Sequence, residues 1–309
     1  MKYLSLCLPT NGIMEWVFPV LDEIFRQDAD INEYEVIVTD NGNNQEFFER
    51  IQEYSKSRSN LIYKKTNAFL FENQIEALRL ATGEYLKFLN HRSILEPGSI
   101  QWMIDMVKET ADEKPVIYFS NGTLKSEKRQ TFGSFDEFVR GLGHYASWTT
   151  GVGVWKTDFE KIPTNHVYNK ISPHSDVLFA ERQKEKYIID DKIWSHDIDT
   201  SHTQKGEYDL YKTFGAEEIT ITLHLYIDGD ISAKTLKHVM RAYENLIADF
   251  YLKFNVFHRP CSYVLDSFED VMGIFLRKKR VLFMAYIKMP KMLVVKAYNK
   301  LRKLKNKND

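Results

Sequence analysis

Cysteine is scarce in this chain: among 309 residues only Cys7 and Cys261 occur. Two cysteines so far apart do not suggest a disulfide framework and are typical of a protein in a reducing compartment. The apolar run near the N-terminus is too short for a signal peptide. No run approaches the roughly 18 uninterrupted apolar residues that a transmembrane helix needs. We therefore expect a cytoplasmic protein without a membrane-spanning segment.

The chain also lacks a strong net charge, because 42 Lys and Arg oppose 43 Asp and Glu. This balance argues against a global field for nucleic acid, and we expect no nucleic-acid partner. Locally the balance fails: residues 277–309 hold twelve Lys and Arg against the single acid Asp309. In residues 277–305 these cations interleave with Met, Phe, Leu and Val at near-helical spacing. The pattern predicts an amphipathic helix on an anionic membrane, at the inner face of the plasma membrane. A helix packed on the protein itself is the alternative.

Short apolar runs alternate with segments of helical periodicity in the first part of the chain. Residues 3–8, 34–39, 61–65, 85–89 and 116–120 are typical of strands. Residues 13–27, 45–56, 72–81 and 99–111 carry apolar residues at helical spacing. Strands that alternate with helices form βαβ units. We therefore expect an α/β fold with a Rossmann-like, mainly parallel mixed sheet flanked by helices.

The second half is less regular. Residues 147–155 mix aromatic, small and hydroxyl side chains and predict a strand along a pocket wall. Ser172 and Pro173 predict a helix start, with the helix running to about Lys184. From about residue 217 helical periodicity returns, most clearly over 232–254. We expect an α/β domain over 1–216, with halves of about 1–105 and 106–216, and then a C-terminal helical region over 217–309.

Five groups of residues follow one another in a characteristic order and spacing: Leu6–Thr10, Val36–Asn41, Asn73 with Ala77 and Ala81–Tyr85, Leu89–Asn90, and Ile94–Leu95 with Pro97–Gly98. In these groups the chain resembles the family-2, GT-A-fold glycosyltransferases of bacterial capsule and surface-polysaccharide biosynthesis. The likeness covers roughly residues 3–105, and more weakly to about 215. It implies a UDP- or dTDP-sugar donor in the first half and a saccharide acceptor in the second. An acceptor linked to polyprenyl diphosphate would fit the basic tail.

Polar residues after the strands form the candidate donor site. A carboxylate at a strand end, such as Asp40, can accept a hydrogen bond from a base N–H or a ribose hydroxyl. The resemblance implies nucleoside contacts there, although Asp40–Gly42 could also be a simple turn. The resemblance also implies that the segment with His202, Lys205, Gly206 and Tyr208 closes over the donor phosphates. The donor-binding set that we expect is Pro9, Thr10, Asp40, Asn41, Lys65, Asn90, His91, Arg92, His202 and Lys205.

The family normally has acidic residues where this chain has His91, Arg92 and Ser93, a degenerate form of its Asp-x-Asp motif. Those carboxylates hold Mn²⁺ or Mg²⁺ against the donor diphosphate. A guanidinium instead suits a diphosphate directly, so metal-independent catalysis with Arg92 is the interpretation that we favour. A metal site rebuilt from His91 with His196 or His202 is a second explanation. A lost active site is the third.

Asp176 is the candidate general base. The resemblance implies an acidic residue at a helix start in the second half, where it removes the proton from the acceptor hydroxyl. The alternative is an acid that only stabilises the helix dipole. Trp148, Thr149, Gly151 and His174 are the acceptor contacts that we expect. Trp148 and Trp155 could stack on a sugar, or simply belong to the core.

These observations predict an inverting glycosyltransferase that acts on a lipid-linked saccharide, with Asp176 and Arg92 as catalytic residues. The rival hypothesis is a non-catalytic protein of the same fold that supports a partner transferase. A nucleotidyltransferase is a weaker alternative. Such enzymes have a Gly-rich, basic loop near the N-terminus, and residues 8–12 are not one.

Overall fold

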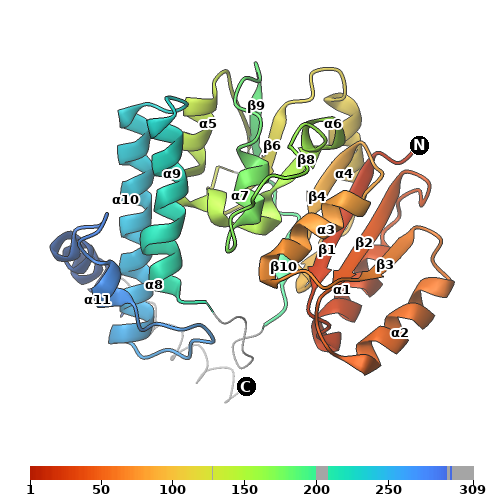
Figure 1. The fold of residues 1–309 in the computed structure, drawn as a ribbon, viewed down its shortest axis with the longest axis horizontal. Coiled ribbons are helices and arrows are strands. Elements are labelled where there is room, and N and C mark those ends of the chain that lie inside the picture. Colours follow the sequence, from red (N-terminus) through yellow and green to blue (C-terminus); the bar gives the residue numbers. More distant parts are fainter. Residues whose placement is uncertain (127, 200–207, 291–292, 294–309) are drawn as a thin grey trace, which may run out of the picture. The chain divides into compact units, whose positions relative to one another are not determined.

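The computed structural model describes residues 1–126, 128–199, 208–290 and 293. The chain divides into two compact units, Met1–Asp199 and Thr200–Asp309. Figure 1 shows the sheet-containing N-terminal unit and the helical C-terminal unit. His202 and Lys205, two of the expected donor contacts, lie outside the described residues.

A five-stranded sheet in the order β3-β2-β1-β4-β8 organises the N-terminal unit. Four strands are parallel and β8 is antiparallel to β4. Nearly all residues of β1 and β2 are buried, because helices cover a parallel sheet on both faces. This confirms the expected α/β fold with a mainly parallel sheet. The strands are β1 (Leu4–Thr10), β2 (Tyr34–Asp40), β3 (Leu61–Lys65), β4 (Tyr85–Phe88) and β8 (Gly153–Trp155).

The helices between these strands occur where the apolar periodicity predicts them. In α1, for example, Trp16, Val17 and Leu21 are buried, so one face of the helix enters the core. In α2, Asn44 accepts a hydrogen bond from Phe47 N and caps the helix. The four helices are α1 (Met14–Arg26), α2 (Gln45–Lys56), α3 (Asn73–Leu80) and α4 (Ser99–Glu109).

Two smaller sheets complete this unit. The first has the order β6-β9-β7, and α5 (Phe135–Leu142) packs on β9. The second pairs β5 antiparallel with β10, two segments about a hundred residues apart. Sequence reasoning missed β5, β7 and β10. The strands are β6 (Val116–Phe119), β9 (Tyr187–Asp190), β7 (Arg129–Phe132), β5 (Ser93–Leu95) and β10 (Ser195–Asp197).

Three predicted boundaries are wrong. The strand expected over 147–155 is only Gly153–Trp155, because a 3-10 turn at Thr149–Gly151 precedes it. The helix expected to reach Lys184 is α7, Pro173–Leu178; the next residue, Phe179, turns its ring into the core against Phe135. The first strand does not stop at Pro9. It continues to Thr10, and beyond Cys7 it is paired only with β2, which leaves an edge that tolerates proline.

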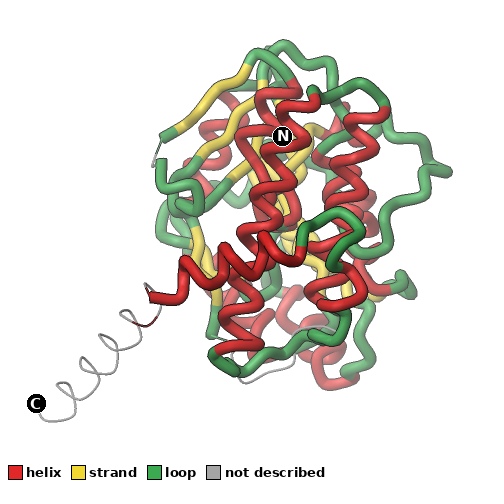
Figure 2. Tube along the Cα trace, turned by 90° about the vertical axis from the view of Figure 1, so that its left-hand side faces the viewer, coloured by secondary structure: helices red, strands yellow, loops and turns green. Residues whose placement is uncertain are grey.

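The C-terminal unit is helical in its described part. A π-helical turn over Thr213–Glu217 leads from α8 (Leu210–Lys212) into α9 (Glu218–Ile227), which packs on α10 (Ala233–Phe250). Ser232 caps α10 by accepting from Thr235 N at 3.2 Å. After α11 (Phe268–Val271), a helix begins at residue 278 and continues to residue 290 (Figure 2). Over the residues described, no helix combines the length and apolar character that crossing a bilayer requires.

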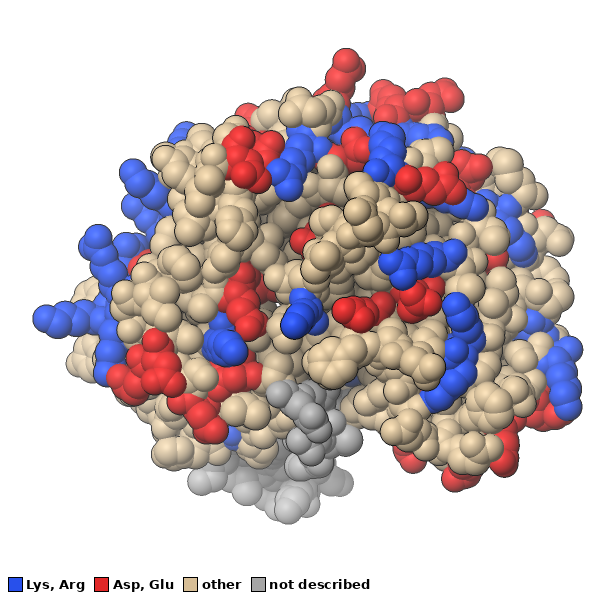
Figure 3. All heavy atoms as spheres, viewed as in Figure 1, with Lys and Arg blue, Asp and Glu red and all other residues tan. Residues whose placement is uncertain are grey.

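Charges of both signs are mixed on the surface. On the face shown in Figure 3, Lys and Arg side chains are interspersed with Asp and Glu. Several cations of the last helix are paired within the unit: Lys278 contacts Glu269 at 2.5 Å and Arg280 contacts Glu244 at 3.0 Å. The face shown therefore has no large patch of one charge sign.

Candidate active site

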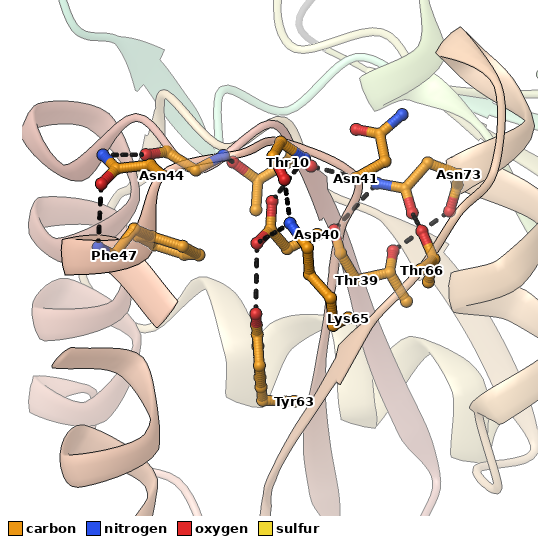
Figure 4. A network of polar contacts seen from close by, with 12 residues as sticks. Thr10, Thr39, Asp40, Asn41, Asn44, Phe47, Tyr63, Lys65, Thr66 and Asn73 are labelled. Carbon is orange, nitrogen blue, oxygen red and sulfur yellow. Dashed lines mark hydrogen bonds and ion pairs between the residues drawn. The ribbon is translucent and has the colours of Figure 1, made fainter. Parts of the chain in front are cut away.

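Asp40 ends β2 at the C-terminal edge of the sheet, and its side chain is fully buried. One carboxylate oxygen accepts from Gly42 N at 2.8 Å. The other accepts from the Tyr63 hydroxyl and from Lys65 Nζ, each at 3.1 Å. Figure 4 shows the Lys65 and Tyr63 side chains converging on this carboxylate. The structure thus brings together the expected donor residues Asp40 and Lys65.

Asn73, the first residue of α3, fixes the loops around Asp40. Its amide nitrogen donates to the carbonyls of Thr10 (3.1 Å) and Thr39 (2.9 Å), and its oxygen accepts from Thr66 Oγ1 at 2.8 Å. One buried side chain therefore ties the ends of β1 and β2 to the segment after β3 (Figure 4). Asn73 is part of the sequence resemblance, but sequence reasoning did not place it in the site.

Thr10 and Asn41 occupy the same edge. The Thr10 hydroxyl accepts from Gly12 N at 3.1 Å, and Pro9 lies beside it at partial exposure. Asn41 Nδ2 donates to the carbonyls of Ala68 and Leu70, both at 3.0 Å. These bonds hold the exposed segment after β3 beside the end of β2.

His91 joins the loop after β4 to this edge. Its Nδ1 is 2.8 Å from Thr10 Oγ1, and its ring meets Trp16 edge-on at 5.1 Å. Burial, with a smaller effect from the neighbouring Arg92 charge, lowers the pKa of His91 to about 3. The contact therefore fits a neutral imidazole whose Nδ1 accepts the Thr10 hydroxyl hydrogen. In this arrangement Nδ1 is already occupied.

Arg92 lies in a loop whose backbone is hydrogen-bonded both to a near neighbour, Asn90, and to a distant residue, Ile198. Its backbone N–H donates to Asn90 Oδ1 at 3.2 Å, and its carbonyl accepts from Ile198 N at 2.9 Å. Its guanidinium Nε is 3.9 Å from Asp197 Oδ2. Asp197 also accepts from the Ser93 hydroxyl at 2.6 Å. Sequence reasoning missed Asp197, because only the β5–β10 pairing brings it here.

The described residues around the Arg92 loop do not form a set suited to a divalent cation. Within the described ranges, no three His, Cys, Asp or Glu side chains come together in a way that could hold a metal ion. Asp197 is the carboxylate beside the loop, and it is next to a guanidinium, which repels a cation. His202 belongs to the residues without a description. Metal independence stays a prediction.

Asp176 lies in the first turn of α7 and is half-buried. Its Oδ2 accepts from Asn169 N at 2.5 Å. Burial raises the pKa of Asp176 above its ordinary value, although the Asn169 N–H and the charges of His166 and Arg182 oppose the shift. The helix α7 packs against α3, whose first residue is Asn73. The short helix α3 therefore contacts both the C-terminal edge of the sheet beside Asp40 and the helix that carries Asp176.

Of the four expected acceptor residues, Gly151 and His174 are buried, and Trp148 and Thr149 are partly exposed. His174 Nδ1 is 3.1 Å from Thr149 Oγ1, and its Nε2 is 3.1 Å from the Ser147 carbonyl. Gly151 packs against the Tyr118 ring so closely that an added Cβ would lie 2.2 Å from Tyr118 Cζ. Trp148 is partly buried against the core. His174 and Gly151 thus shape the turn, and direct sugar contact by these residues stays a prediction.

Trp155, one of the two tryptophans considered for stacking on a sugar, lies in the hydrophobic core. It is 1% exposed, and its Nε1 donates to the Pro115 carbonyl at 2.7 Å. The alternative that it belongs to the core is correct.

Solved structures with a similar fold include TarS of S. aureus. The 1–349 fragment with UDP-GlcNAc has a TM-score of 0.59 at 13% identity, over 89% of this chain and 80% of that one. The fragment with UDP has a TM-score of 0.55 at 14% identity, over 84% and 73%. Against the longer TarS chain (TM-score 0.54, 14% identity), 84% of this chain spans 44% of that one. Among curated proteins, none matches. The glycosyl transferase family 2 profile matches residues 11–172, more than half of the sequence, and the chain belongs to that family.

Proposed function

We propose that this glycosyltransferase moves a sugar from a UDP- or dTDP-sugar to a saccharide acceptor with inversion at the anomeric carbon. The observation that carries the proposal is the packing of α7 on α3. The helix that carries the half-buried Asp176 thereby packs on the helix whose first residue, Asn73, holds the strand ends beside Asp40. Solved TarS structures contain UDP-GlcNAc and UDP, which supports a uridine nucleotide as the first donor to test.

In the proposed reaction Asp176 takes the proton of an acceptor hydroxyl. The acceptor oxygen forms a bond to the anomeric carbon while the bond from that carbon to the diphosphate oxygen breaks. The electron pair leaves with the nucleoside diphosphate, and Arg92 offsets its charge. Asp40 and Lys65 would hold the nucleoside, with Thr10 beside them. Each step uses a group of this chain.

We further propose that the acceptor is linked to polyprenyl diphosphate, in the synthesis of capsule or another bacterial surface polysaccharide. An anionic membrane surface would then be the partner of residues 277–305. Support comes from the helix over 278–290. Val281 and Ala285 are buried, whereas Phe283, Tyr286 and Ile287 are 62%, 71% and 59% exposed. Aromatic and aliphatic side chains exposed at positions i, i+3 and i+4 are typical of a helix that lies in the membrane interface.

The first experiment is a donor panel with the purified full chain. Calorimetry with UDP, dTDP, GDP and CDP identifies the nucleotide, and release of nucleotide from the matching sugars measures turnover. We expect micromolar binding of UDP or dTDP together with slow donor hydrolysis. Binding without any turnover, including in the presence of a membrane lipid extract, would support the rival scaffold hypothesis. Binding of none of the nucleotides would refute the proposal.

A further inference from the structure

Lys87 is a lysine inside the hydrophobic core. It lies on β4 and is completely buried. Its Nζ donates to the carbonyls of Phe88 at 2.9 Å and Val152 at 3.3 Å, and also to that of Thr150. Three acceptors match the three N–H donors of an ammonium group.

Two aromatic rings complete the surroundings of this ammonium. Lys87 Nζ lies 5.0 Å from the centroid of Phe119 and 4.7 Å from that of Trp194. Ring faces attract a cation, most strongly where water is absent. Burial lowers the pKa of Lys87. The hydrogen bonds to three carbonyls and the contacts with two rings act in the opposite direction and favour the charged form. A lysine this costly to bury calls for a specific role.

The carbonyls that Lys87 binds belong to two places in the candidate active site. Thr150 and Val152 form the turn on the acceptor side, whereas Phe88 ends β4, two residues before Asn90. Phe88 N also donates to the Val152 carbonyl at 3.1 Å. Lys87 therefore joins the acceptor-side turn to the strand that leads into the Arg92 loop.

Two other elements hold the same turn, which we define as residues 147–152. From β6, the Tyr118 hydroxyl lies 3.5 Å from the Trp148 carbonyl in the turn, and it also donates to the Tyr145 carbonyl just before the turn. From α7, His174 contacts Ser147 and Thr149. Polar side chains from three different elements thus fix one short turn.

We propose that Lys87 is a positioning residue for sugar transfer, whose ammonium sets the place of turn 147–152 relative to the loop of Arg92. This inference rests on the proposed function, because it treats the turn as part of the acceptor side. Lys87 acts through the turn and touches no substrate. Removing the Lys87 ammonium should therefore disturb the turn and slow turnover, while the sheet edge around Asp40 stays intact.

The test compares Lys87→Met, which keeps the side-chain length and removes the charge, with wild type and with Lys64→Met, an exposed lysine on β3. Three quantities are measured: amide hydrogen exchange in residues 147–153, UDP affinity, and UDP-sugar turnover. For Lys87→Met we expect at least tenfold faster exchange in the turn and at least tenfold slower turnover, with UDP affinity within threefold. Unchanged exchange in the turn would overturn the proposal. So would a loss of UDP affinity as large as the loss of turnover.

A gentler variant keeps the inference testable if Lys87→Met does not fold. Lys87→Gln removes the charge and retains an N–H donor for the carbonyls of Thr150 and Val152. The same pattern at smaller size is expected, and an unchanged turn would again contradict the proposal. If wild type binds no nucleotide, the proposed function fails, whereas the exchange measurement still decides whether Lys87 fixes the turn.

Discussion

Lys65 lies directly opposite Asp40 in the register of β3 and β2, with 3.1 Å between Lys65 Nζ and Asp40 Oδ2. The carboxylate is buried and the lysine is 38% exposed at its side chain, so the ammonium covers the acid from the solvent side. A nucleoside that reaches Asp40 must therefore share it with Lys65 or move Lys65 aside. This pair is the most direct target for testing whether the sheet edge around Asp40 binds a nucleotide.

Asp40→Asn should weaken UDP binding by about 10- to 100-fold. The reason is that a hydrogen bond to a charged group contributes about 1.5–3 kcal/mol, and each 1.4 kcal/mol is tenfold in affinity. Calorimetry of the full chain measures the change. Asp28→Asn, an exposed acid after α1, is the matched control and should bind like wild type. Equal binding by both variants would remove Asp40 from the site.

Asn73→Ala should lower the free energy of unfolding by about 2–4 kcal/mol, because it removes three buried hydrogen bonds: those to the carbonyls of Thr10 and Thr39 and the one from the Thr66 hydroxyl. Urea denaturation measures this loss. UDP affinity should fall as well, since the ends of β1 and β2 lose their common tie. An unfolding free energy within about 0.5 kcal/mol of wild type, the usual range for surface substitutions, would contradict this account of Asn73.

Asp176→Asn should slow turnover by about 10²- to 10⁴-fold while UDP binding stays within twofold, because a general base acts only on the chemical step. Asp112→Asn, an exposed acid, serves as control. Substantial turnover in Asp176→Asn would rule out the carboxylate as base.

The raised pKa of Asp176 predicts how stability and turnover depend on pH. A carboxyl whose folded-state pKa lies above its unfolded value stabilises the fold at low pH and loses that contribution as pH rises through the folded pKa. At pH 7 the Asp176→Asn variant should therefore be as stable as wild type or more so. Turnover of wild type should fall as pH drops through the same pKa, since the base must be ionised. Thermal denaturation and a pH–rate profile check both signs.

Arg92→Met should reduce turnover by about 10²- to 10³-fold, the usual effect of removing a group that stabilises developing charge. Arg92→Lys should recover part of that loss, because a lysine keeps the charge without the bidentate geometry. Arg79→Met, an exposed arginine on α3, is the control. Wild type should stay active in EDTA. Complete loss of activity in the chelator, with recovery on adding Mn²⁺, would favour a rebuilt metal site over Arg92.

Replacing Phe283, Tyr286 and Ile287 together by Ser should reduce binding to anionic vesicles at least tenfold. Each side chain would bury apolar surface in the interface, worth roughly 1.5–3 kcal/mol when complete. Co-sedimentation with phosphatidylglycerol vesicles measures the effect, and wild-type binding should weaken as salt rises. Val264→Ser, at another exposed apolar position of this unit, is the control. Equal binding by the triple variant and wild type would exclude this face as the membrane contact.

The parts of the fold that could be predicted from the sequence are those that depend on the spacing of apolar residues within short segments. Apolar periodicity places the strands that end at Asp40, Lys65 and Phe88, and the helices between them, within a few residues. Parallel strands then bring their C-terminal ends to one edge. For this reason the local pattern of the chain is enough to group Asp40 with Lys65.

The remaining features depend on contacts between distant segments. Asp197 has no local signal, because its place beside Arg92 follows from antiparallel pairing with a strand of three residues. Lys87 lies in an apolar run. Two of the three carbonyls that accept hydrogen bonds from its buried ammonium belong to the distant residues Thr150 and Val152. The turn before β8 resembled a strand because Thr and Trp favour strands, yet the Tyr118 ring against Gly151 requires a different path.

The pairing of Ser93 with Asp197 joins positions 104 residues apart, and it completes the loop of Arg92. Contacts of such long range form slowly, because a large loop must close before they are gained. We therefore expect the Arg92 loop to become ordered late in folding, after the parallel strands have assembled. A nascent chain that has emerged only as far as β9 would already possess the sheet edge around Asp40 and still lack the complete Arg92 loop, where we propose that the diphosphate binds.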